Sequence, residues 1–167
     1  MTDVNPSMSA TPARPTLLTV ICILSFIMGA WGIFSGFQNL VVDQTAALDK
    51  ARVEMEQARA DLGEQASGLP GKMLDSAMDL AEKTAANATP IGISTIVLSL
   101  ISLFGVWQMW NLRKNGFWLY VLSSVAGLAT TVYFLGGSMV AILSVGFAGF
   151  FSLVFIILYA VNLKHMH

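Results

Sequence analysis

The sequence predicts an all-α membrane protein with four transmembrane helices and an extracytoplasmic helical hairpin between the first and the second. Three observations indicate this class. Of the 167 residues, 55% are hydrophobic and only 11% are charged, whereas a soluble domain of this length needs more polar surface. Four long segments carry no charge, and the charged residues are sorted between the segments that join them. The mean hydropathy is +0.68.

The four apolar segments are long enough to cross a bilayer. A helix needs about 20 mostly apolar residues for this, because its backbone amides must bond internally where no water is present. None of the segments contains Asp, Glu, Lys, Arg, His or an internal proline. We therefore expect transmembrane helices over residues 16–42, 90–112, 116–136 and 139–163.

The two ends of the chain are expected to be short tails. Residues 1–15 combine three prolines with Ser, Thr and Ala, and such a composition cannot bury enough surface to offset the entropy of ordering. This predicts a disordered cytoplasmic tail. Pro15 suits a helix start, because the N–H that it lacks would be unpaired there. Residues 164–167 are predicted to form a second cytoplasmic tail.

The loop over residues 43–89 carries two helical patterns. Spacings of three and four, typical of one helix face, relate Leu48, Ala51, Met55, Ala58, Leu62, Gln65 and Leu69. After the turn-forming Gly68-Leu69-Pro70-Gly71, the pattern restarts with Leu74, Met78, Ala81, Ala85 and Ala88. This predicts an antiparallel hairpin whose arms continue the first two spans outward. The alternative is a hairpin lying flat on the outer leaflet, although surface-lying helices are usually basic.

The charges predict the orientation in the membrane. Lys and Arg next to a span favour the cytoplasm, and the segments that would lie there contain Arg14, Arg113, Lys114 and Lys164. The 43–89 loop holds five Lys or Arg and nine carboxylates, a net charge of −4. We therefore expect both termini in the cytoplasm and the loop outside.

Aromatic residues support this orientation, because Trp and Tyr favour the headgroup level. The predicted interfacial anchors at the inner ends of the spans are Trp107, Trp110, Arg113, Lys114, Trp118, Tyr120, Tyr159 and Lys164. Trp31 falls near the middle of its span, where we expect it to pack against a neighbouring helix.

Small residues recur on one stripe of the first span, at Ser25, Gly29, Gly32 and Gly36. Such stripes let two backbones approach closely in a membrane. We expect helix packing here and at a second stripe, Ser144, Ala148 and Ser152. The partner of the first stripe is another span, a second copy or another membrane protein; packing within the chain is favoured.

No residues form a pattern that carries chemistry. Proteases and lipid-modifying enzymes need acid, Ser/His or metal constellations, whereas the only histidines, His165 and His167, have no third ligand nearby. Cys22 is the only cysteine and is expected to be buried apolar filler. We predict no enzymatic activity, cofactor or metal, and the absence of a basic stripe argues against nucleic-acid binding.

Three segments resemble small four-span membrane proteins common in bacterial genomes. They are Arg14–Val20, Asn111–Tyr120 and Val161–Met166. The resemblance covers the spans, leaves out the 43–89 loop, and implies a location in the bacterial inner membrane but no activity.

The functional hypothesis is a non-catalytic accessory or scaffold subunit, because chemistry is lacking while two contact surfaces are present. Its partners would be the lipid bilayer and another membrane protein or a second copy. The alternative is a small oligomeric pore or carrier for a small solute, with Ser and Thr lining the pathway. A sensor would need a separate partner for its output.

Overall fold

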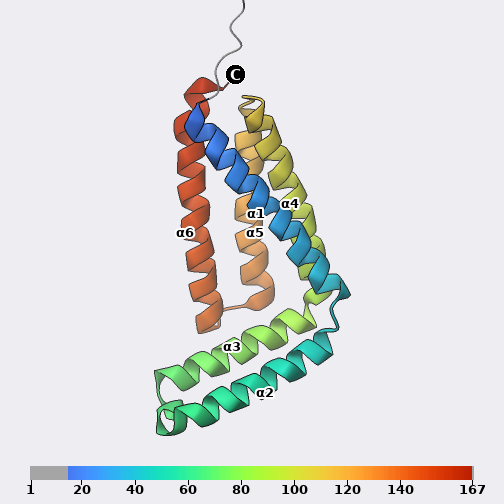
Figure 1. The fold of residues 1–167 in the computed structure, drawn as a ribbon, viewed down its shortest axis with the longest axis vertical. Coiled ribbons are helices and arrows are strands. Elements are labelled where there is room, and N and C mark those ends of the chain that lie inside the picture. Colours follow the sequence, from blue (N-terminus) through green and yellow to red (C-terminus); the bar gives the residue numbers. More distant parts are fainter. Residues whose placement is uncertain (1–14, 167) are drawn as a thin grey trace, which may run out of the picture.

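The computed structural model describes residues 15–166, and this part is built from helices without any strand. Figure 1 shows their arrangement, with α1 (Thr16–Val41), α2 (Gln44–Leu62), η1 (Gly63–Ser67), α3 (Leu69–Ala86), α4 (Ala88–Trp110), α5 (Asn115–Leu135), α6 (Met139–Asn162) and η2 (Leu163–His165). Four of them, α1, α4, α5 and α6, are long and apolar enough to cross a membrane. Their ends lie within two residues of the predicted spans. The predictions for the N-terminal tail, Arg14 and His167 lie outside the described residues.

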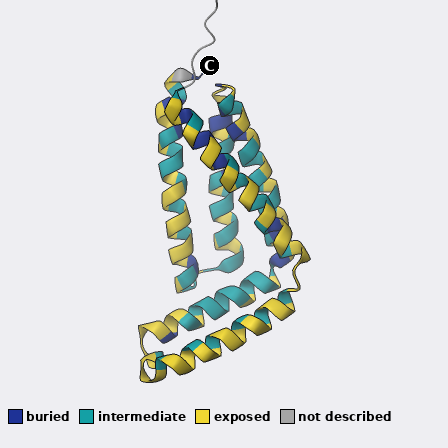
Figure 2. Cartoon of the chain, in the orientation of Figure 1, coloured by how far each residue is buried: buried dark blue, intermediate teal, exposed yellow. Residues whose placement is uncertain are grey.

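The four long helices form a bundle whose core lies at one end. α1 packs mainly on α4, and α4 on α5, while α6 lies beside α5 and meets α1 more sparsely. Fully buried side chains gather at the end that holds the turn after α4, the basic end of the bundle (Figure 2). This core consists of Leu18, Ile21, Cys22, Val106, Met109, Leu112, Phe117, Tyr159 and Met166. Toward the other end α1 and α4 remain in close contact at Gly36 and Gly92.

The turn between α4 and α5 places two cations at the basic end. Leu112 has a positive φ of 61°, and the N–H groups of Leu112 and Arg113 donate to the carbonyls of Met109 and Gln108. This pattern satisfies carbonyls at a helix end and usually employs glycine. Here burial of the Leu112 side chain in the core stabilises the unusual conformation. Arg113 and Lys114 consequently point outward, both exposed.

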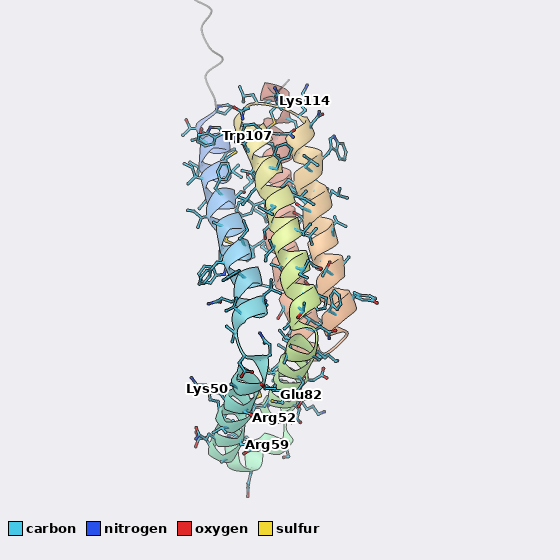
Figure 3. The ribbon with its side chains drawn as sticks, turned by 90° about the vertical axis from the view of Figure 1, so that its right-hand side faces the viewer. Lys50, Arg52, Arg59, Glu82, Trp107 and Lys114 are labelled. Carbon is cyan, nitrogen blue, oxygen red and sulfur yellow. The ribbon has the colours of Figure 1, made fainter. Side chains whose placement is uncertain are left out.

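The polar segment forms two helices, α2 and α3, that lie side by side in opposite directions (Figure 1). Ion pairs join them at two points along their length: Arg52 lies 3.0 Å from Glu82, and Arg59 lies 3.0 Å from Asp75. Figure 3 shows Arg52 and Glu82 close together there. Each pair is about half-exposed, so each contributes at most about 1 kcal/mol.

The turn between these helices differs from the prediction. We expected the first helix to run on to Leu69, but α2 ends at Leu62 and Gln65 belongs to the 3₁₀ helix η1. Gly63 ends α2 with a positive φ of 51°, which a glycine adopts without steric cost. Leu69 and Pro70 instead begin α3, since proline is well suited to a first helical turn.

The α2–α3 pair does not continue the spans, in contrast to our expectation. Val42 has an extended backbone, and Asp43 then caps α2 by accepting from the Thr45 hydroxyl and from the Thr45 and Ala46 amides. These bonds hold the pKa of the Asp43 carboxyl below its usual value. At the other junction, Asn87 ends α3 and its side chain donates to the Lys83 carbonyl. The chain bends at both junctions, and α3 lies against the ends of α5 and α6 (Figure 1).

Candidate functional site

The predicted small-residue stripe of α1 packs within the chain. A methyl group built on Gly29 would lie 2.5 Å from the Leu103 side chain, and one on Gly36 would lie 2.9 Å from the Gly92 carbonyl oxygen. A methyl group on Gly32 would overlap Ser99. All three contacts are made to α4, so the stripe is occupied inside this chain.

Other glycines, which the sequence reasoning did not single out, bring α4 and α5 equally close. A methyl group on Gly105 would lie 2.8 Å from the Gly116 carbonyl oxygen, and one on Gly116 would overlap the Gly105 carbonyl and lie 2.8 Å from the Met109 nitrogen. Gly92 mirrors Gly36 in the α1–α4 contact. Gly105 lies five residues before the end of α4 and Gly116 is the second residue of α5, so their positions in the sequence did not by themselves pair them.

Ser25, the first member of the stripe, has a different role. It is buried and accepts a hydrogen bond of 2.8 Å from the Tyr159 hydroxyl. The Tyr159 ring packs edge-on against Tyr120 with centroids 5.1 Å apart. Both tyrosines were predicted as interfacial anchors, but Tyr159 is fully buried. They lie inside the bundle and tie α6 to α1 and α5.

The other predicted anchors lie at the basic end. Trp107 and Trp118 are exposed, as are Arg113, Lys114 and Lys164, and Figure 3 shows Trp107 and Lys114 at the end opposite the α2–α3 pair. Trp110 instead packs edge-on against Phe26, with centroids 6.1 Å apart. Trp31, expected to contact another helix, is 65% exposed and contacts Phe34 of its own helix. Its ring therefore faces outward from the bundle.

A cavity of about 800 Å³ lies among the four long helices. Its walls are mainly apolar, with Leu24, Met28, Leu98, Leu128, Phe147, Phe151 and Phe155. Nine Ser and Thr side chains interrupt them: Ser25, Thr95, Ser99, Ser102, Ser123, Ser124, Thr130, Thr131 and Ser152. Along α5 the lining runs from Tyr120 to Leu135, about 22 Å at the usual helical rise.

The cavity ends at the buried core on one side of its length and is open laterally, since several of its apolar lining residues are exposed. Tyr120 and Ser25, which line it, lie beside the buried core at the basic end. At the other end the lining reaches Ile91 and Leu135, close to the α2–α3 pair. The second predicted stripe borders this space instead of packing on a helix: Ala148 and Ser152 line it, and Ser144 is exposed.

The hydroxyls of the cavity differ in how they are satisfied. Thr130 and Thr131 donate to backbone carbonyls of their own helix at 2.8 and 2.9 Å, the usual arrangement for such residues in apolar surroundings. The Oγ of Ser152 is buried and has no hydrogen-bond partner among the described residues. A buried hydroxyl without a partner costs free energy. Because this oxygen has almost no accessible surface, a molecule in the cavity would reach it only after the Ser152 side chain rotates.

Comparisons with known proteins give no further guide to the site. No protein-family model matches the chain, and searches of curated proteins and of solved structures give no match. Among residues 15–166, no group of three or more His, Cys, Asp or Glu is arranged to hold a metal ion.

Proposed function

We propose that this is a non-catalytic membrane protein that binds a small lipophilic molecule in the cavity between its spans. The observation that carries the proposal is the cavity itself, with its apolar walls and the Ser and Thr side chains among them. A volume of about 800 Å³ falls within the range of small-molecule sites, which are mostly apolar with a few polar groups that fix orientation.

The carrier alternative derived from the sequence is retained in a modified form. Ser and Thr do surround a pathway-like space, yet the space belongs to a single chain and ends at the close-packed core. These features favour reversible binding of one molecule over conduction through an oligomeric pore.

An accessory or scaffold role is the second proposal. The small-residue stripe of α1 no longer supports it, because α4 occupies that stripe. Support comes instead from α6, where the small residue Ser144 is exposed and lies outside the cavity lining, so it allows the close approach of a helix of another chain. Co-purification of a stoichiometric membrane protein, lost in Ser144→Leu, would favour this role.

Filling the cavity is expected to abolish binding of a lipophilic probe. Gly127 lines the cavity and has no neighbouring atom within 4 Å of a methyl group placed on it, so Gly127→Phe should project into the space. We expect dodecanol to bind the wild type and to bind Gly127→Phe at least tenfold more weakly, by native mass spectrometry of protein released from detergent.

The matched control is Gly146→Phe. Gly146 is equally unobstructed but lies outside the cavity lining, so this variant should bind dodecanol like the wild type. Equal binding by Gly127→Phe would place the probe elsewhere, and absence of binding by the wild type would overturn the proposal.

We also propose that the protein lies in the inner membrane of a bacterial cell. In this orientation the α2–α3 pair forms an extracytoplasmic hairpin, and both termini lie in the cytoplasm. The distribution of charge supports this orientation. The exposed Arg113, Lys114 and Lys164 belong to the basic end, whereas the segment with a net charge of −4 lies at the opposite end (Figure 3).

Single cysteines should report this orientation. Ser67 and Asn115 are exposed at opposite ends of the bundle, and the native Cys22 is buried, so the unsubstituted protein serves as the blank. In intact cells a membrane-impermeant maleimide should label Ser67→Cys and leave Asn115→Cys unlabelled until the cells are permeabilised. The reverse pattern would invert the proposed topology.

A further inference from the structure

The outer end of the cavity lies close to a lysine. α3 packs against the ends of α5 and α6, and a methyl group placed on Gly136, in the turn after α5, would lie 3.4 Å from Lys83 Nζ. The preceding residue, Leu135, lines the cavity. An ammonium group therefore lies beside the end of the cavity that is not closed by the core.

Lys83 retains capacity to bind a further group. Its ammonium donates to Asp79 Oδ2 at 2.7 Å, and an ammonium has three N–H donors. The Lys83 side chain is 39% exposed, so the remaining donors can be reached. Its apolar stem can meanwhile lie along the ends of the spans, as lysine stems do at membrane interfaces.

The carboxylates around Lys83 are largely paired. Glu82 and Asp75 of α3 are each bound by an arginine of α2, which leaves Asp79 as the carboxylate in contact with Lys83. The arginines of α2 thus partly neutralise the carboxylates on the side of α3 that faces α2. Lys83 lies on the side of α3 that faces the spans.

These observations narrow the kind of molecule that the site suits. Resting on the proposed binding function, we infer that the cavity takes an amphiphile with a single apolar chain and an anionic headgroup, the chain lying among the spans and the headgroup bound by Lys83 beside Gly136. A carboxylate or a phosphate ester provides the required oxygens. Hydrogen bonds from a cation to such oxygens are among the stronger ones in proteins.

Three probes with the same twelve-carbon chain separate the headgroup from the chain: dodecanoate, dodecyl phosphate and dodecanol. Binding is measured by native mass spectrometry of the intact chain. The wild type is expected to bind the two anions about five- to tenfold more tightly than dodecanol. The preference is no larger because Lys83 is partly exposed, and water weakens ion pairs at exposed sites. Stronger binding of one anion over the other would identify the headgroup.

The variant that tests the inference is Lys83→Gln. It should bind dodecanoate and dodecyl phosphate no more tightly than dodecanol, with dodecanol binding unchanged. Lys83→Arg should restore the preference. Lys72→Gln is the matched control, because it removes the same charge from an exposed position on the same helix and should keep the preference.

Each other result has a definite meaning. An anion preference that survives in Lys83→Gln, or that is lost equally in Lys72→Gln, overturns the role of Lys83 while the cavity still binds its chain. A wild type that binds dodecanol as tightly as the anions also overturns it. If the wild type binds none of the three probes, the proposed function and this inference are both overturned.

Discussion

Gly116→Ala is expected to destabilise the bundle by about 1–3 kcal/mol, the range for inserting an extra methyl group into a close-packed contact. The new methyl group would overlap the Gly105 carbonyl and lie 2.8 Å from the Met109 nitrogen. Both are backbone atoms of α4, so no side chain can rotate away and the two helices must separate. We expect a lower SDS concentration at the midpoint of unfolding, followed by circular dichroism in mixed micelles.

Gly127→Ala is the control for this effect. Gly127 lies on the same helix, α5, but a methyl group there would meet no atom within 4 Å. Because alanine favours helix more than glycine does, this variant should unfold at the wild-type midpoint or slightly above it. An unchanged midpoint in Gly116→Ala would mean that α4 and α5 are farther apart than described.

Tyr159→Ala is expected to cost about 3 kcal/mol, at the low end of the range for truncating a buried aromatic side chain. We expect the low end of that range because lipid is as apolar as the side chain, so burial of the ring in a membrane lacks the hydrophobic driving force that acts in water. Tyr159 is fully buried, packs on Tyr120 and donates to Ser25. Since α6 meets α1 sparsely, loss of the Tyr159 ring should loosen the contact of α6 with α1 at the basic end. The same unfolding titration measures this effect.

Two further variants separate packing from hydrogen bonding. Tyr159→Phe keeps the ring and loses the bond to Ser25, which should cost about 0.6 kcal/mol, the average for such bonds between membrane helices. Ser25→Ala should add little to Tyr159→Phe if the two groups act only on each other. Phe150→Ala, on an exposed face of α6, should leave stability unchanged. If Tyr159→Ala costs no more than Tyr159→Phe, the ring does not hold α6.

The spans were predictable from the sequence because the requirement for them is local. Each backbone amide in a bilayer must bond within its own helix, so an uncharged apolar run of sufficient length specifies a helix without reference to its neighbours. The bounds of α1, α4, α5 and α6 accordingly agree with prediction. The start of α1 was likewise a local signal, since Pro15 was expected at a helix start and directly precedes α1.

Side-chain orientation was predicted less well. Trp31 and Tyr159 are both aromatic residues of apolar spans, yet Trp31 is 65% exposed and Tyr159 is fully buried. In lipid, an apolar side chain is compatible with either face of a helix, so hydrophobicity does not distinguish them. The glycines of α1 do mark a helix contact, whereas the small residues Ala148 and Ser152 of α6 line the cavity instead.

The sequence by itself determined four lipid-compatible helices, two polar helices between the first two of them, and the separation of basic from acidic segments. Only the tertiary structure decided that α4 occupies the α1 stripe, that α3 lies across the ends of α5 and α6, and that nine Ser and Thr side chains line one cavity. The physical reason is the separation in sequence of the residues that determine each feature. Helix formation in a membrane depends on the composition of one segment, whereas a cavity depends on the angles at which four separate helices meet, and those angles are set by contacts between residues far apart in the chain.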